Sequence, residues 1–147
     1  MTDALEAAKQ FVDAFNSHDD RRIRQAYADN VVFEAPGGVR LEGPDAATAF
    51  AMSFIRAFPD VRLTLKNLFE SDGWVAYEAE FEGTHEDTLE GTGGDIPATH
   101  RRATGRAAEI LRIEDGKVTE ERLYFDQLEL LTQLGVIEQP QEAGALT

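Results

Sequence analysis

The sequence predicts one α+β domain, on three observations. The chain is 147 residues long, which suits one compact core. Apolar residues recur every three to four positions in the first third and later mainly at every second position, so helices precede strands. Two Asp-Gly pairs, at 72–73 and 115–116, are strong signals of antiparallel hairpins. Helices followed by a run of strands are typical of an α+β domain and not of a βαβ sheet.

Two helices are predicted at the N-terminus. Asp3 and Glu6 have the spacing of a capping box, and they start an apolar stripe made up of Leu5, Ala8, Phe11, Val12 and Phe15. This pattern predicts a helix over residues 3–17. Asp19 or Asp20 can cap a second, shorter helix that ends near Asp29.

A pair of short strands and a third helix come next. Residues 31–33 and 39–41 are typical of strands, and a Pro-Gly-Gly turn separates them. Pro44 suits the first position of a helix, and Asp45 complements the positive end of the helix dipole. We expect Pro59 to end this helix.

The rest of the chain predicts two hairpins and a terminal helix. The first hairpin covers about residues 63–82 and the second about residues 107–126. Between them, residues 83–104 are rich in Gly and Thr, and a connection of this length is hypothesised to be a lid. A short helix should follow and end at Gly135. The predicted domain is therefore 1–137, with a flexible tail over 138–147.

Composition and charge exclude several classes of partner. The chain has 28 Asp and Glu against 14 Lys and Arg, a formal net charge of −14, so neither nucleic acid nor a membrane is expected as a partner. It has no cysteine, which excludes disulfides and thiolate ligands and is compatible with the cytoplasm. No apolar stretch approaches the roughly 20 residues of a membrane helix. Its His and acidic residues lack the spacing of a metal site, so no metal is expected.

The second hairpin has a predicted register that groups polar side chains. A two-residue turn at 115–116 places Glu109 opposite Arg122. Tyr124 and Asp126 then point to the same side, because alternate residues of a strand share a face. This face either lines a polar pocket or is solvated and carries ordinary ion pairs, and a register shift of one residue would reverse the assignment.

Five motifs occur in an order that matches a known family. They are Phe58-Pro59-Asp60, Gly83-Thr84-His85, Thr104-Gly105-Arg106, Glu114-Asp115-Gly116-Lys117-Val118, and the segment from Asp126 to Gln133-Leu134-Gly135. Over roughly residues 3–137 the chain thus resembles the SnoaL-like polyketide cyclases, or ester cyclases, of the NTF2-like superfamily. The resemblance implies a curved, mixed but mainly antiparallel sheet, wrapped into a cone by about three N-terminal helices and a short C-terminal one. It also implies a deep apolar pocket, and homodimers or homotetramers formed through the sheet.

The resemblance implies a reaction as well. Characterised members of the family close the last ring of an aromatic polyketide by intramolecular aldol condensation, with neither metal nor organic cofactor. Asp126 matches their acid–base position, and we expect His85, in the Gly-Thr-His motif, to polarise a carbonyl of the small-molecule substrate. Asp126 could equally cap the terminal helix, and His85 could instead fix the loop geometry. Many relatives carry an aromatic residue at the position of Arg122, so the substrate here is expected to be smaller or anionic.

Further side chains are candidates for substrate contact. Besides the catalytic pair Asp126 and His85, the predicted substrate-binding residues are Arg122, Tyr124, Glu109, Phe15, Phe33, Phe54 and Trp74. Two other functions stay open. One is a non-catalytic small-molecule binding protein on the same cone. The other is an epoxide or ester hydrolase that uses Asp126, Arg122 and Glu109.

Overall fold

The structure is a computed structural model that describes residues 3–91 and 94–137. This part of the chain contains four helices and six strands. In chain order they are α1 (Asp3–Ser17), α2 (Asp20–Gln25), β1 (Tyr27–Ala35), β2 (Val39–Glu42), α3 (Pro44–Ala57), β3 (Arg62–Ser71), β4 (Trp74–Thr84), β5 (Arg102–Glu114), β6 (Lys117–Phe125) and α4 (Gln127–Gln133). The predicted tail over 138–147 lies outside the described residues.

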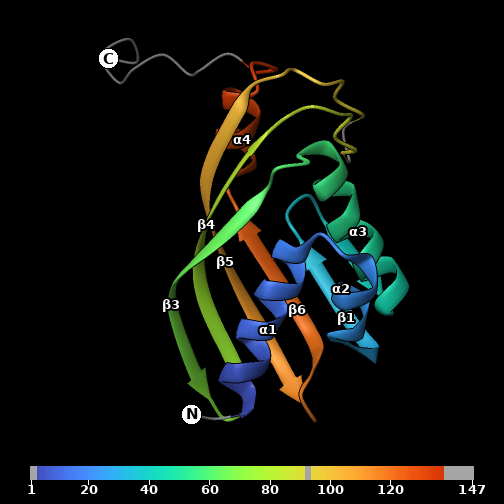
Figure 1. Ribbon diagram of the computed structural model, residues 1–147, viewed down its shortest axis with the longest axis vertical. Helices are drawn as coiled ribbons and strands as arrows, with labels where there is room; N and C mark the ends of the chain where they lie inside the picture. The colour runs from blue at the N-terminus through green and yellow to red at the C-terminus, as the bar shows by residue number, and fades with distance from the viewer. Residues whose placement is uncertain (1–2, 92–93, 138–147) are drawn as a thin grey trace.

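The strands form one curved sheet in the order β2-β1-β6-β5-β4-β3 (Figure 1). Neighbouring strands are antiparallel except β1 and β6, which run parallel. Helices α1, α2 and α3 lie in front of one face of the sheet in Figure 1, and α4 lies at its upper end. This arrangement confirms the predicted α+β class with a mixed, mainly antiparallel sheet.

Local signals set the helix ends close to where they are predicted. Asp19 caps α2, because its side chain accepts hydrogen bonds from the backbone N–H groups of Arg21 and Arg22. Pro44 is the first residue of α3, and that helix ends at Ala57, two residues before Pro59.

Helix α2 is shorter than predicted, because the residues that should form its C-terminal end belong to strand β1 instead. It ends at Gln25, and β1 already begins at Tyr27 instead of residue 31. Tyr27 pairs with Val118 of β6, and the backbone N–H of Val118 donates to the carbonyl oxygen of Ala26 at 2.9 Å. A contact with a distant strand therefore outweighs the local helical pattern.

The β5–β6 register differs from the prediction by one residue. Ile113 pairs with Val118, but Arg112 pairs with Glu120, so Thr119 is an extra residue on β6. Such a bulge moves every later side chain of one strand to the opposite face relative to its partner. The predicted shared face of Glu109, Arg122, Tyr124 and Asp126 is therefore wrong.

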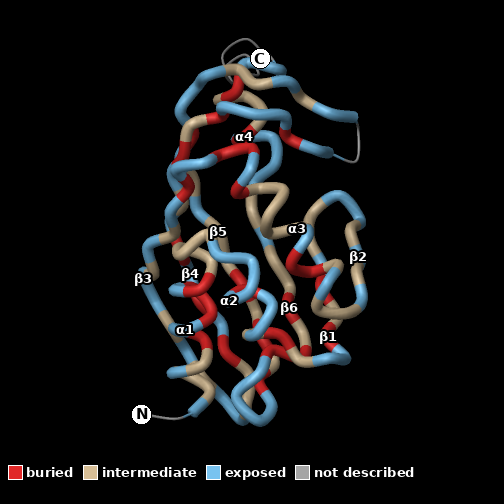
Figure 2. The backbone as a smooth tube through the Cα atoms, turned by 45° about the vertical axis from the view of Figure 1, so that its right-hand side comes forward, coloured by how far each residue is buried: buried red, intermediate tan, exposed pale blue. Residues whose placement is uncertain are grey.

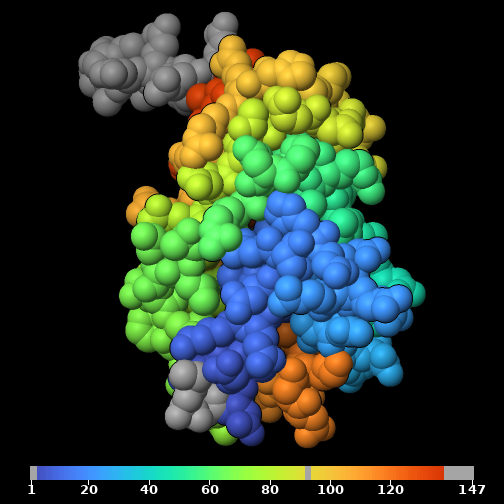
Figure 3. Space-filling view, viewed as in Figure 1, coloured from blue at the N-terminus to red at the C-terminus, as the bar shows by residue number. Residues whose placement is uncertain are grey.

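The core lies between the helices and the concave side of the sheet. Buried positions follow the strands behind the helices, whereas the outer turns of α2 and the strand β3 are largely exposed (Figure 2). In the space-filling view α1 and α2 pack side by side and cover this region (Figure 3). The largest fully buried side chains include Tyr77, Phe58 and Leu111.

Candidate functional site

An inner cavity of about 90 Å³ lies between helices α1–α3 and the sheet. Its walls are mostly apolar and aromatic. Phe15, Phe33 and Phe54 line it, as predicted for the substrate pocket, together with Phe11 and Phe81. An apolar concave site with a few polar groups is the usual form of a small-molecule pocket.

Four polar side chains on the sheet side line this cavity, and we call them the floor network. They come from four neighbouring strands: Tyr77 from β4, Glu109 from β5, Glu121 from β6 and Tyr27 from β1. The hydroxyl of Tyr77 donates to Glu109 Oε2, and the hydroxyl of Tyr27 donates to Glu121 Oε1 at 2.6 Å. Each of the four residues is at most 5% exposed. The network thus runs across the sheet beneath the apolar walls.

The two carboxyl groups of the floor network, Glu109 and Glu121, form an acid pair. Burial raises the pKa of both, and the pKa of Glu121 is raised further by the charge of Glu109. The interaction between the two carboxyl groups lowers the pKa of Glu109 and raises that of Glu121, so it favours a proton on Glu121. No lysine or arginine is among the described residues that line the cavity. We infer that the pair holds a shared proton, since two like charges in one apolar site repel each other.

The tyrosines of the floor network stay protonated. Burial is the largest cause that raises the pKa of Tyr27, followed by the charge of Glu121, and the pKa of Tyr77 is raised in the same way by burial and by Glu109. Both hydroxyls therefore act as hydrogen-bond donors to the acid pair. Titratable groups perturbed by burial and by a specific partner inside a pocket are characteristic of functional sites.

A second, outer cavity of about 310 Å³ lies between α3, the connection over 85–101 and α4. Phe50, Phe54 and Phe125 line both cavities, so at most one layer of side chains separates them. The connection contributes Leu89 and Ile96, which pair as a short antiparallel bridge. Whether this segment moves as a lid stays a hypothesis.

Asp126 is next in the chain to residues that line the outer cavity, but it is not itself among the residues that line either cavity. It is the N-cap of α4, and its Oδ1 accepts a hydrogen bond from the backbone N–H of Glu129 at 3.0 Å. Its two chain neighbours, Phe125 and Gln127, both line the outer cavity, whereas Asp126 itself is exposed. The capping role is thus confirmed, and the second carboxylate oxygen is left for another partner.

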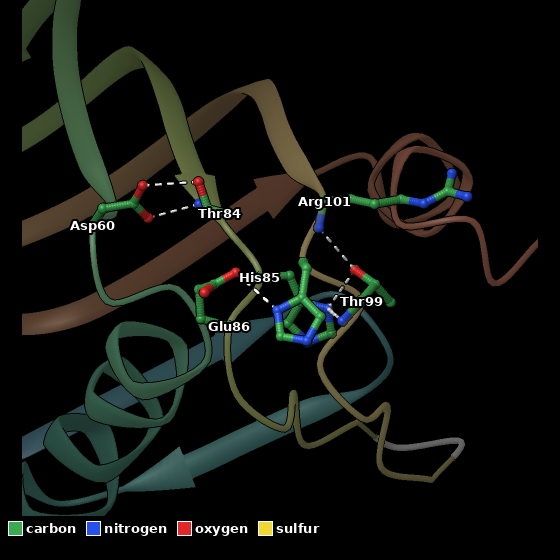
Figure 4. A network of polar contacts seen from close by, with 7 residues as sticks. Asp60, Thr84, His85, Glu86, Thr99 and Arg101 are labelled. Carbon is green, nitrogen blue, oxygen red and sulfur yellow. Dashed lines mark hydrogen bonds and ion pairs between the residues drawn. The ribbon is translucent and has the colours of Figure 1, made fainter.

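His85 is buried beside the connection and lines neither cavity. Its Nδ1 accepts a hydrogen bond from the backbone N–H of Thr99 at 3.2 Å and lies 2.9 Å from the hydroxyl of Thr99 (Figure 4). Its ring stacks on Phe58 with centroids 5.3 Å apart. Burial lowers the pKa of His85, which favours the neutral ring. These contacts hold the two ends of the connection together. His85 therefore lies where the alternative prediction put it, in a position that fixes the geometry of the loop.

Three predicted substrate-binding residues lie on the outer face of the sheet, away from the inner cavity. The guanidinium of Arg122 lies 5.4 Å from the ring centre of Trp74 and 3.3 Å from a carboxylate oxygen of Glu120. Tyr124 is 52% exposed. The Thr119 bulge explains the placement of Arg122 and Tyr124.

Two expectations based on Arg122 therefore fail. Arg122, Glu109 and Asp126 do not meet, so the structure does not assemble the set required for the proposed epoxide or ester hydrolase. The argument for an anionic substrate fails too, because Arg122 does not reach into the pocket.

Sequence reasoning missed three members of the floor network. Tyr27 falls within the range predicted for the second helix, and neither Tyr77 nor Glu121 is among the predicted site residues. One signal was available: past the bulge, Glu121 alternates with Leu123 and Phe125, so it belongs to an apolar face.

Within residues 3–91 and 94–137, no group of three or more His, Cys, Asp or Glu side chains is placed to hold a metal ion. No helix in these ranges has the length and apolar character needed to cross a membrane.

The sequence and the fold are both similar to known proteins. A family model of the SnoaL-like polyketide cyclases matches residues 5–134. The chain belongs to the SnoaL-like polyketide cyclase family. It is 27% identical over 140 residues to an aklanonic acid methyl ester cyclase of Streptomyces peucetius, covering 92% of each chain. It is 28% identical over 142 residues to the cyclase of the same name from Streptomyces sp. strain C5, covering 92% of this chain and 83% of the relative.

Solved structures confirm the fold of this SnoaL-like chain. A putative SnoaL-like polyketide cyclase from Jannaschia sp. CCS1 superposes with a TM-score of 0.80 at 18% identity, over 94% of both chains. The expected NTF2-like cone, with its sheet wrapped by helices, is therefore the observed fold.

Proposed function

We propose that the protein is a cofactor-free cyclase that closes a ring in a polyketide-type carbonyl substrate by intramolecular aldol chemistry. One observation carries the proposal: in a SnoaL-like chain, two adjacent cavities share aromatic walls, and the carboxylate-bearing Asp126 directly follows Phe125, which lines both of them. The smaller cavity of about 90 Å³ cannot hold a polycyclic substrate by itself. We therefore place the reacting carbonyls in the outer cavity of about 310 Å³.

The proposed steps need a single carboxylate. Asp126 removes a proton from a carbon flanked by carbonyls, and the resulting enolate attacks a second carbonyl of the same molecule. One carbon–carbon bond forms while the π bond of that carbonyl becomes an alkoxide, which takes the proton back from Asp126. Substrate and product are isomers. A carboxylate suffices because such a carbon acid is already activated, so that orientation by the aromatic walls is the main requirement.

Asp126→Asn tests this proposal with little risk to the fold, since Asn caps helices as well as Asp does. Aklanonic acid methyl ester, the compound in the names of two relatives, is the first candidate substrate. We expect turnover to fall about 10²- to 10⁴-fold, the usual contribution of a general acid–base group. Product is measured by chromatography as an isomer of unchanged mass.

Asp19→Asn provides a matched control. Asp19 is also an exposed N-cap aspartate, on α2, and lines neither cavity. Turnover should be unchanged in this variant. Undiminished turnover in Asp126→Asn would remove the acid–base role of Asp126.

A second candidate function is non-catalytic binding of a small molecule. The exposure of Asp126 favours it, because a general base usually works in a site that excludes water. In that case candidate carbonyl compounds should bind and be recovered unchanged after long incubation with the wild-type protein.

A further inference from the structure

The acid pair at the floor of the inner cavity has no part in the aldol steps assigned to Asp126. Glu109 and Glu121 line the inner cavity, and each is only 5% exposed. A buried carboxyl pair without a neighbouring cation is costly to keep in an apolar site. Such groups are commonly retained where they bind or react with a ligand.

The hydrogen bonds of the floor network leave one carboxylate oxygen, Oε1 of Glu109, able to accept a further hydrogen bond. Tyr77 already donates to Glu109, and Tyr27 already donates to Glu121. Oε1 of Glu109 is buried and receives no hydrogen bond from an N–H or O–H donor among the described residues, apart from the proton shared within the acid pair. A carboxylate oxygen has more than one lone pair, so it can accept from a ligand as well. The missing partner is a donor.

We propose that the acid pair is a binding site for a phenolic or enolic hydroxyl on the end of the ligand that enters the inner cavity, and that this hydroxyl donates to the carboxylate of Glu109. The inference rests on the proposed function in one respect, because it takes the inner cavity as part of the substrate site. Ethers and esters lack the donor, so they do not satisfy the acid pair in this way.

The size of the inner cavity limits what enters it. Its volume is about 90 Å³. It is smaller than an engineered protein cavity of about 150 Å³ that binds benzene. The floor is therefore reached by the edge of one substituted ring, and the remainder of the ligand lies towards Phe50, Phe54 and Phe125, the side chains shared with the outer cavity.

The two carboxyl groups of the acid pair also restrict the charge of the ligand that can reach them. The cavity has two carboxyls and, among its described lining residues, no lysine, arginine or histidine. An anionic group next to the acid pair would be repelled without any compensating cation. The ring that reaches the floor is therefore neutral.

Three probes with one ring system separate these features. 2-Naphthol carries the hydroxyl, 2-methoxynaphthalene has the same shape without the donor, and 2-naphthoate carries a negative charge. Dissociation constants are measured by titration calorimetry at pH 6. We expect wild-type protein to bind 2-naphthol about tenfold or more tightly than 2-methoxynaphthalene, because the ether leaves a buried acceptor unpaired. We expect 2-naphthoate to bind most weakly.

Two variants and one control assign the effect to Glu109. In Glu109→Leu the preference for 2-naphthol over its methyl ether should fall to about twofold or less, since the acceptor is gone. Glu120→Gln is the matched control, because Glu120 precedes Glu121 on β6 but lies on the opposite face, with Arg122. Its preference should equal that of the wild type.

Fluorescence supplies a readout that a purely structural role of Glu109 would not change. Excited 2-naphthol is a strong acid, so a hydroxyl held against a carboxylate emits as naphtholate. We expect this emission from the wild-type complex and its loss in Glu109→Gln, whose amide cannot take the proton. The Gln variant also serves if Glu109→Leu does not fold.

Each other outcome would overturn the proposal. Equal affinity for 2-naphthol and its ether in the wild type, failure of both to bind, or a preference that survives in Glu109→Leu would do so. Naphtholate emission that persists in Glu109→Gln would as well. These experiments need no turnover, so their result is independent of whether Asp126→Asn loses activity.

Discussion

Two carboxylate sites on the same cone differ in almost every physical respect. The acid pair at the floor of the inner cavity is 5% exposed and receives both tyrosine hydroxyls, and the described residues that line this cavity include no lysine or arginine. Asp126, next in the chain to two residues that line the outer cavity, is exposed and caps a helix. The residue type is similar, but burial sets the chemistry. The buried acid pair is suited to holding a proton, and the exposed Asp126 is suited to receiving one from a substrate.

The largest expected difference between the acid pair and Asp126 is in how the free energy of unfolding depends on pH. The pKa of Glu121 is raised in the folded protein by burial and by Glu109, relative to about 4.3 in an unfolded chain. The stability that this group contributes is therefore fully present below about pH 4.3 and is lost as the pH rises through the folded pKa. We expect the free energy of unfolding of the wild type, relative to Glu121→Gln, to fall over this window.

Denaturant unfolding at a series of pH values measures this difference. The Gln side chain keeps an acceptor for Tyr27 and cannot ionise, so its curve should lack the decline. The Glu120→Gln variant should follow the wild type. Parallel curves for wild type and Glu121→Gln would show that the acid pair is not perturbed by burial.

Removal of a single donor from the floor should be the next largest effect. Tyr77→Phe leaves the buried carboxyl of Glu109 without its hydroxyl donor, at a cost of about 1–3 kcal/mol in the free energy of unfolding. Tyr124→Phe is the control, because Tyr124 is half exposed on the outer face. A loss of stability that is equal in the two variants would contradict the role assigned to the floor network.

Loss of the N-cap of α4 at Asp126 should lower the free energy of unfolding by less. Asp126→Ala removes the acceptor of the Glu129 N–H, and N-cap replacements of this kind cost about 0.5–2 kcal/mol, typically about 1. Thermal unfolding of Asp126→Ala and Asp126→Asn measures this loss of stability. We expect Asp126→Asn to retain most of the wild-type stability, because Asn is also a good N-cap. If Asn were as destabilising as Ala, the capping hydrogen bond would not be the cause.

Arg122→Gln should have the smallest effect. Arg122 is part of an ion pair with Glu120 on the outer face, and surface pairs contribute about 0–1 kcal/mol. We also expect unchanged affinity for 2-naphthol, since Arg122 lines neither cavity. A tenfold loss of affinity would return Arg122 to the pocket and contradict the observed register.

Much of the fold was predictable because its signals act over a few residues. The N-cap Asp19 and Pro44 at the start of α3 each fix a helix end through neighbours in the chain. The Asp-Gly pairs set both hairpin turns in the same way, with Asp72 and Asp115 at positive φ. Phe15, Phe33 and Phe54 line the inner cavity, whereas Trp74, which was grouped with them, does not.

The sequence by itself therefore determined the class of fold, the elements and the apolar walls of the pocket. Only the tertiary structure decided which polar groups meet inside it. The Thr119 bulge turned Arg122 outward and Glu121 inward, and a distant strand pairing made Tyr27 part of the sheet. The physical reason is that caps and turns depend on near neighbours, whereas register and the burial of a charge depend on strands far apart in the chain.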